Sequence, residues 1–89
     1  MEVPSSQIEA LAFPNPASDE INIDISQIHE DGEKRIRVVN MSGQVFIDRI
    51  IRGEGNVLTL GVSSLPSGIY AYRIYNAESE IVNWKFVKE

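Results

Sequence analysis

Hydrophobic and polar residues alternate along most of the chain with a period of two, the pattern of strands that bury one face. It is clearest at Ile21, Ile23 and Ile25, which alternate with polar residues and place three isoleucines on one side of a strand. Comparable segments lie at residues 35–38, 45–51, 58–60, 70–75 and 82–87. With a short first strand near residues 8–13, the pattern predicts about seven strands. No segment shows the 3.6-residue period of an amphipathic helix.

The alternation also predicts which side chains form the core. In the last two strands, the residues that we expect to be buried alternate with others that face solvent. The residues that we expect to be buried are Tyr70, Tyr72, Ile74, Val82, Trp84 and Phe86.

Turn-forming residues separate these strands at intervals of about 8–14 residues, the spacing of an antiparallel sandwich. They are rich in Gly, Pro, Asn, Asp and Ser and lie at residues 14–16, 31–32, 42–43, 53–56, 66–68 and 76–79. The chain therefore predicts an all-β fold, an immunoglobulin-like antiparallel β-sandwich.

Two connections predict hairpins. Residues 40–44 suit a tight turn in which Gly43 adopts a left-handed conformation that a β-carbon would disfavour. Residues 76–80 predict a second hairpin, which joins the last two strands.

Two further segments predict corners of the sandwich. Pro14 and Pro16 fix their own φ angles and push each preceding residue toward extended backbone, so we expect a stiff corner without hydrogen bonds between the first two strands. The segment Leu65-Pro66-Ser67-Gly68-Ile69-Tyr70 resembles a tyrosine corner, where a tyrosine hydroxyl bonds a backbone group a few residues upstream. Leu65 would enter the core and Tyr70 would hold the crossover.

Length and charge narrow the possible functions. The 89 residues suffice for one domain, which we place at residues 9–89 after a polar linker remnant at residues 1–8. Thirteen acidic and eight basic residues give a net charge of −5, which opposes binding to nucleic acid. No apolar run approaches the ~20 residues that span a bilayer, so we expect no membrane insertion.

The sequence contains no recognisable catalytic or metal-binding set. The absence of cysteine excludes disulfides, thiolate metal sites and cysteine nucleophiles. His29 is the only histidine, and neither a nucleophile nor further metal ligands accompany it in a recognisable pattern. The carboxylates lack calcium-loop spacing. We therefore expect no enzyme activity, no cofactor and no metal.

Three stretches, in order, resemble the type A C-terminal sorting domains of the bacterial type IX (Por) secretion system. The first is residues 13–19, with Pro14-Asn15-Pro16, and the second is the hairpin at residues 38–45. The third is Leu-Pro-Ser-Gly-Ile-Tyr at residues 65–70, together with the terminal strand at residues 84–88. The family often has tyrosine at the position of Phe13 and a basic residue at that of Gln44.

This resemblance implies a sorting signal that directs a larger cargo protein across the outer membrane of a Gram-negative bacterium. A cysteine-peptidase-type sortase would then remove the domain. The implied partners are the outer-membrane translocon, the sortase and N-terminal cargo domains of the same chain. The implied location is the periplasm in transit, then the cell surface or the extracellular space. The recognition candidates are Pro14, Asn15, Pro16, Gly43, Leu65, Gly68, Tyr70, Lys85, Phe86, Val87 and Lys88.

The terminal strand allows two interpretations. As structure, Phe86 joins the core while Lys85 and Lys88 keep an exposed sheet edge from pairing with other chains. As signal, the same edge accepts a strand from a receptor. An alternative function remains open as well: an immunoglobulin- or fibronectin-like accessory module that binds carbohydrate or protein, with Tyr75 and Trp84 as its exposed aromatics.

Overall fold

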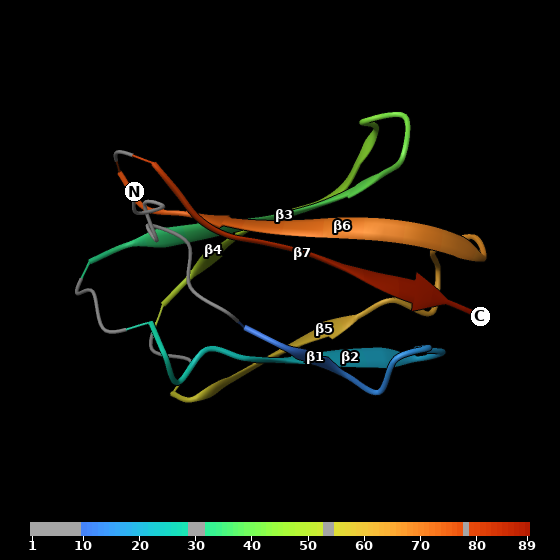
Figure 1. Cartoon of the computed structure of the whole chain (residues 1–89), viewed down its shortest axis with the longest axis horizontal. Coiled ribbons are helices and arrows are strands. Elements are labelled where there is room, and N and C mark those ends of the chain that lie inside the picture. The colour runs from blue at the N-terminus through green and yellow to red at the C-terminus, as the bar shows by residue number, and fades with distance from the viewer. Residues whose placement is uncertain (1–9, 29–31, 53–54, 78) are drawn as a thin grey trace, which may run out of the picture.

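The computed structural model of the protein describes residues 10–28, 32–52, 55–77 and 79–89, and within them seven strands form two facing sheets (Figure 1). The strands are β1 (Ala12–Phe13), β2 (Glu20–Asp24), β3 (Lys34–Asn40), β4 (Val45–Ile51), β5 (Val57–Gly61), β6 (Gly68–Tyr75) and β7 (Glu80–Lys88). One sheet has the order β1-β2-β5 and the other β4-β3-β6-β7, with every neighbouring pair antiparallel. The predicted all-β sandwich is confirmed.

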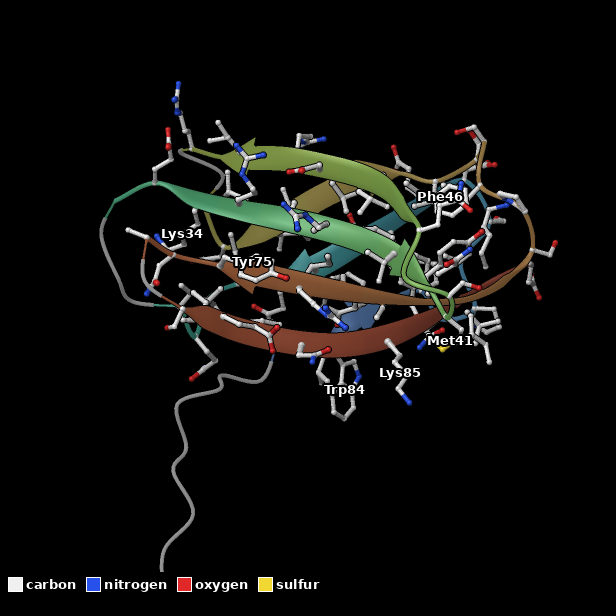
Figure 2. The ribbon with its side chains drawn as sticks, turned by 90° about the horizontal axis from the view of Figure 1, so that it is seen from above. Lys34, Met41, Phe46, Tyr75, Trp84 and Lys85 are labelled. Carbon is white, nitrogen blue, oxygen red and sulfur yellow. The ribbon has the colours of Figure 1, made fainter. Side chains whose placement is uncertain are left out.

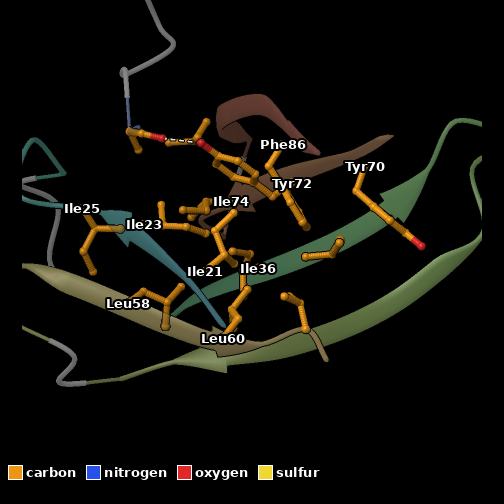
Figure 3. Close-up of a cluster of buried hydrophobic side chains, with 14 of the residues drawn as sticks. Ile21, Ile23, Ile25, Ile36, Leu58, Leu60, Tyr70, Tyr72, Ile74 and Phe86 are labelled. Atoms are coloured by element: carbon orange, nitrogen blue, oxygen red, sulfur yellow. Dashed lines mark hydrogen bonds between the residues drawn. The ribbon is translucent and has the colours of Figure 1, made fainter. Parts of the chain in front are cut away.

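Most of the core consists of residues that the alternation pointed inward (Figure 3). Ile21 and Ile23 of β2 face Ile36 and Val38 of β3, and all four are fully buried. Leu58, Leu60, Tyr72, Ile74, Val82 and Phe86 are buried in the same cluster. Each such side chain contributes roughly 1.5–3 kcal/mol by leaving water, so the core is the main source of stability.

Tyr72 ties the two sheets together. Its ring is buried in the core, and its hydroxyl donates a hydrogen bond of 2.6 Å to the carbonyl of Ala10, just before β1. Burial raises the pKa of the Tyr72 hydroxyl, so this group keeps its proton and its bond. The buried Tyr72 hydroxyl therefore has a hydrogen-bond partner and stays uncharged.

The hairpin at residues 40–44 decides which sheet receives β4. Only residues 41–44 separate β3 from β4, so β4 pairs with β3. A constant-type immunoglobulin domain places its fourth strand in the other sheet. The short turn thus makes the second sheet four-stranded and leaves β4 at its edge.

Trp84 differs from its prediction. The register pairs it with Tyr72, yet 50% of its surface is exposed. β7 is the outermost strand of its sheet, and β1, at one edge of the other sheet, is only two residues long. The indole therefore lies at the open margin of the sandwich rather than in the core, and Figure 2 shows it beyond the edge of β7.

The beginning of the domain is described only in part. The first strand was expected near residues 8–13, and the structure places β1 at Ala12–Phe13. The linker predicted at residues 1–8 and the histidine at position 29 lie outside the described residues.

Candidate functional site

The predicted recognition residues gather at one end of the sandwich. Asn40, at the β3–β4 hairpin, pairs with Tyr70, while Gly68 pairs with Lys88 at the end of β7. Ala17, just after the proline segment, forms an isolated bridge with Lys88. We call this region the motif end, and it is the end at which Figure 1 marks the C-terminus.

The proline segment is bound to the last strand. The Val87 N–H donates to Oδ1 of Asn15 (2.9 Å), and the Ala17 N–H donates to the Val87 carbonyl (2.8 Å). The Glu89 N–H in turn donates to the Ala17 carbonyl (2.9 Å). We call these contacts, between residues 15–17 and residues 87–89, the terminal bridge.

The terminal bridge corrects two predictions. The corner at residues 14–16 was expected to lack hydrogen bonds, whereas Asn15 bonds β7 through its side chain. The outer edge of β7 was expected to be open at its end, whereas residues 87–89 are already paired there. The peptide bonds before Pro14 and Pro16 are both cis, and both prolines are exposed.

The tyrosine corner forms as predicted. The Tyr70 hydroxyl donates to the Pro66 carbonyl at 2.5 Å, and the Tyr70 ring is buried. Its ring stacks on Phe86 at a centroid distance of 5.6 Å and meets Phe46 edge-on at 5.5 Å. Leu65 is buried in the core cluster, as expected. Tyr70 therefore connects the crossover to the last strand through both its hydroxyl and its ring.

Lys88 is buried, which corrects its prediction as a guard of the exposed edge. Only 7% of its surface is accessible, and its ammonium donates to the carbonyls of Leu65 and Glu89, each at 3.0 Å. A buried lysine is tolerated when carbonyls satisfy its donors. Lys88 thus locks the end of β7 to the tyrosine corner, whereas Lys85 is exposed as predicted.

The β3–β4 hairpin supplies the remaining candidate. Gly43 has a φ of +89°, the left-handed region that was predicted. Oδ1 of Asn40 accepts hydrogen bonds from the N–H groups of Ser42 (3.0 Å) and Gln44 (2.9 Å), so one side chain holds the turn together. Gly43 therefore acts on the shape of the hairpin, with nothing within 4 Å of the position of its missing β-carbon.

The candidate residues divide by burial into two groups. Leu65, Tyr70, Phe86 and Lys88 are buried; the first three act by packing, and Lys88 acts through its hydrogen bonds. The exposed ones, which an incoming partner can touch directly, are Pro14, Asn15, Pro16, Gly43, Gly68, Lys85 and Val87.

Sequence reasoning missed Ala17, which is completely buried and supplies both backbone groups of the terminal bridge. Its short side chain, flanked by Pro16 and Ser18, carries no periodic signal. Its role depends on residues some 70 positions away, such as Val87. No local pattern could have revealed that contact.

The described residues contain neither a metal-ligand cluster nor a membrane-spanning helix. Within it, no group of three or more His, Asp or Glu side chains is arranged to hold a metal ion. Among the same residues, no helix is long and apolar enough to cross a bilayer.

Comparison with known proteins agrees with this arrangement. A search of curated proteins finds no match to the chain. A family model described as the secretion system C-terminal sorting domain matches residues 11–89, which include all seven described strands and the terminal bridge. The protein therefore belongs to the family of type IX secretion system C-terminal sorting domains.

Proposed function

We propose that this domain carries its cargo through the outer-membrane translocon of the type IX system, and that the translocon reads the motif end. Family membership makes the domain a sorting signal for export to the cell surface or the extracellular space, and the family is not an enzyme class. The observation that carries the proposal is the terminal bridge. It joins the first motif to the last across 72 positions of sequence, so the motifs form one surface only after folding.

Periplasmic transit follows from this proposal, because a signal that exists only in the folded domain must fold before it is read. The compact core and the satisfied polar atoms of Tyr72 and Lys88 support folding of the domain as a unit. Pro14, Asn15 and Pro16 are then exposed beside the end of β7. The translocon would meet a rigid surface rather than an extended peptide.

The test places the domain behind a signal peptide and a reporter in a type IX-competent host. Ser18→Arg combined with Ser67→Arg adds bulk and charge at exposed positions of the motif end. The matched control is Asn56→Arg with Ala77→Arg, at exposed turns of the opposite end. We expect the first pair to retain the reporter in the periplasm and the control to be exported. Equal export of both folded variants would contradict a role for the motif end.

Point substitutions suit this test better than removal of the tail. Deleting residues 85–89 takes away the buried side chains of Phe86 and Lys88 together with the terminal bridge. The loss of Phe86 alone corresponds to roughly 3–5 kcal/mol. A failure of export would then report unfolding rather than loss of a signal.

A cysteine-peptidase-type sortase then removes the domain, with the cut at or upstream of residues 1–8. β1 runs toward the motif end, so Ala10, the first described residue, lies on the far side of β1 from it. Cleavage and recognition would therefore use different ends of the domain. Mass spectrometry of the exported reporter should show loss of the domain in a sortase-active host and its retention when the sortase cysteine is replaced.

The adhesion alternative lacks a shared aromatic platform. Tyr75 lies on the outer face of β6, with the Arg37 guanidinium 5.6 Å from its ring centroid. Trp84 belongs to the opposite face of β7, since its cross-strand partner is Tyr72. The two aromatics that such a module would use therefore point to different sides of the sheet.

A further inference from the structure

Positive charge is confined to one of the two sheets. All eight lysines and arginines of the chain belong to the four-stranded sheet or, for Arg52, follow it directly. They are Lys34, Arg35, Arg37, Arg49, Arg52, Arg73, Lys85 and Lys88. The facing sheet has none and carries Glu20 and Asp24 on β2. The register places Arg35, Arg37, Arg73 and Lys85 on the outer face of this sheet, so a chain with a net charge of −5 has a local cluster of cations on this side.

The centre of this side has more positive than negative charge. Arg37 and Arg73 are direct cross-strand partners, an arrangement of like charges that disfavours the sheet. The Asp48 carboxylate forms ion pairs with both Arg35 (N–O distance 2.6 Å) and Arg37 (3.4 Å). Within the described residues, Arg73 and Lys85 form no ion pair.

Each arginine of the Arg37–Arg73 pair also has one nitrogen without a hydrogen-bond acceptor among the described residues. The Nε atoms of Arg37 and Arg73 are shielded from water and have no hydrogen-bond partner in the described residues. Buried donors are nearly always satisfied in folded proteins. The arginine pair therefore carries an energetic penalty that the folded domain does not relieve by itself.

The arginine pair borders a hollow on the outer face. Arg37, Arg73 and Lys85 line it together with Val39 and Ala71, and the β3–β4 hairpin flanks it. Figure 2 views this face from above, with Tyr75, Lys85 and the hairpin residue Met41 labelled around the sheet. The hollow thus offers cations at its sides and short apolar side chains between them.

The apolar character continues toward the motif end. Ile69 and Val87 are cross-strand partners two positions beyond Ala71 and Lys85, on the same face. Ile69 is 50% and Val87 40% exposed, and Met41 of the hairpin is 59% exposed. An exposed apolar patch next to unpaired cations is typical of an interaction surface.

We propose that this surface, the basic face (Arg37, Ile69, Arg73, Lys85 and Val87), docks an acidic protein segment with apolar side chains from the secretion machinery. The inference rests on the proposed function and adds a partner chemistry to it. Charge complementarity points to carboxylates against the arginine pair and Lys85, and Ile69 with Val87 takes the apolar side chains. A polyphosphate partner fits less well, because it has no apolar side chains to place against Ile69 and Val87.

The export test uses reporter fusions of the full 89-residue chain in a type IX-competent host. Arg73→Glu with Lys85→Glu reverses two charges of the basic face. Arg49→Glu with Arg52→Glu makes the same charge change at exposed positions of the sheet margin. We expect the first pair to lower export by about tenfold or more and the second to leave it near wild type. Arg73→Lys with Lys85→Arg keeps the charges and should restore export.

Stability separates docking from folding. Replacing Arg73 by Glu removes a like-charged neighbour of Arg37, so the thermal midpoint of the double variant should equal or exceed that of the wild type. A lower midpoint together with lost export would assign the arginine a structural role and overturn the proposal.

A binding measurement identifies the class of partner. Purified translocon, immobilised, should bind the wild-type domain more tightly than the Arg73→Glu, Lys85→Glu variant, and added salt should remove that difference. Vesicles of phosphatidylglycerol and phosphatidylcholine should sediment neither; sedimentation of the wild type alone would indicate a lipid partner and overturn the proposal. If the wild-type fusion stays in the periplasm, the sorting function itself fails. If wild type and double variant export equally, only the basic face fails.

Discussion

At the scale of single residues, the motif end is held by side chains that satisfy backbone groups. The Tyr70 hydroxyl bonds the Pro66 carbonyl, the Lys88 ammonium bonds the Leu65 carbonyl, and the Asn15 amide oxygen bonds the Val87 N–H. The Asn15 and Lys88 contacts join segments that no regular strand pairing connects, and the Tyr70 contact closes the crossover just before β6. The Lys88–Leu65 bond is buried, so removing the ammonium leaves the Leu65 carbonyl poorly solvated, which is the expensive case for a hydrogen bond.

Tyr70→Phe should lower the free energy of unfolding by about 0.5–1.5 kcal/mol, because it removes the hydroxyl and keeps the ring contacts with Phe46 and Phe86. Urea titration monitored by tryptophan fluorescence measures the change. Tyr75→Phe is the control, since the Tyr75 hydroxyl forms no hydrogen bond with another of the described residues. Unchanged stability of Tyr70→Phe would show that the Tyr70–Pro66 hydrogen bond does not stabilise the domain.

Lys88→Met keeps an unbranched stem and deletes the ammonium, so the Leu65 carbonyl loses its donor. We expect a loss of about 1–3 kcal/mol in the same titration. Lys85→Met, at an exposed position of the same strand, should stay within about 0.5 kcal/mol of the wild type. Equal effects of the two substitutions would contradict the buried role of Lys88.

At the scale of elements, short connections decide which strands become neighbours. The hairpin at residues 40–44 forces β4 against β3, and the β6–β7 hairpin, closed by the Asn76 N–H to Ser79 carbonyl bond of 2.9 Å, places β7 at the other edge. The four-stranded sheet therefore has two edge strands that differ in their protection. β7 is covered at its end by the terminal bridge.

Gly43→Val should destabilise the domain by about 1–2 kcal/mol, because a β-branched residue is strained at a φ of +89°. Gly61→Val is the matched control: Gly61 lies in β5 without a positive φ, and its absent β-carbon would also meet nothing within 4 Å. Thermal unfolding of both variants gives the comparison. A loss at Gly61 as large as that at Gly43 would rule out backbone conformation as the cause.

At the scale of the whole molecule, charge is divided between the sheets, and each sheet holds a carboxylate that favours its ionised form. Hydrogen bonds from Ser26 hold the pKa of Asp24 in β2 below its usual 3.8. The hydrogen bond from Arg35 does the same for the pKa of Asp48 in β4, helped by the charges of Arg35 and Arg37. Both groups are on the surface, so their contributions are modest and screened by salt.

The resulting pH dependence has a definite sign. Because both pKa values are lower in the folded state, this stabilisation is present above the ordinary value of 3.8 and disappears as the pH falls through the lowered values. The urea midpoint should therefore drop between pH 5 and pH 2. In the double variant Asp24→Asn, Asp48→Asn the drop should be smaller; a drop as steep as that of the wild type would assign it to other carboxylates.

Much of the fold could be predicted from the sequence because its causes are local. The period of two decides which face of a strand is apolar, so Ile21, Ile23 and Tyr72 were assigned to the core correctly. The left-handed turn at Gly43 and the hydroxyl bond of Tyr70 depend on residues within a few positions. The three motifs were likewise found as short segments.

The sequence by itself thus determined the strands, their inward faces and the family-like motifs, since alternation and turn chemistry act over a few residues. Only the tertiary structure decided that Trp84 lies at an open margin, that Lys88 is buried and that Asn15 and Ala17 close the edge of β7. It also decided that Arg37 and Arg73 stand side by side. These features depend on which strands become edges and which distant segments meet, and that is settled when the two sheets pack against each other.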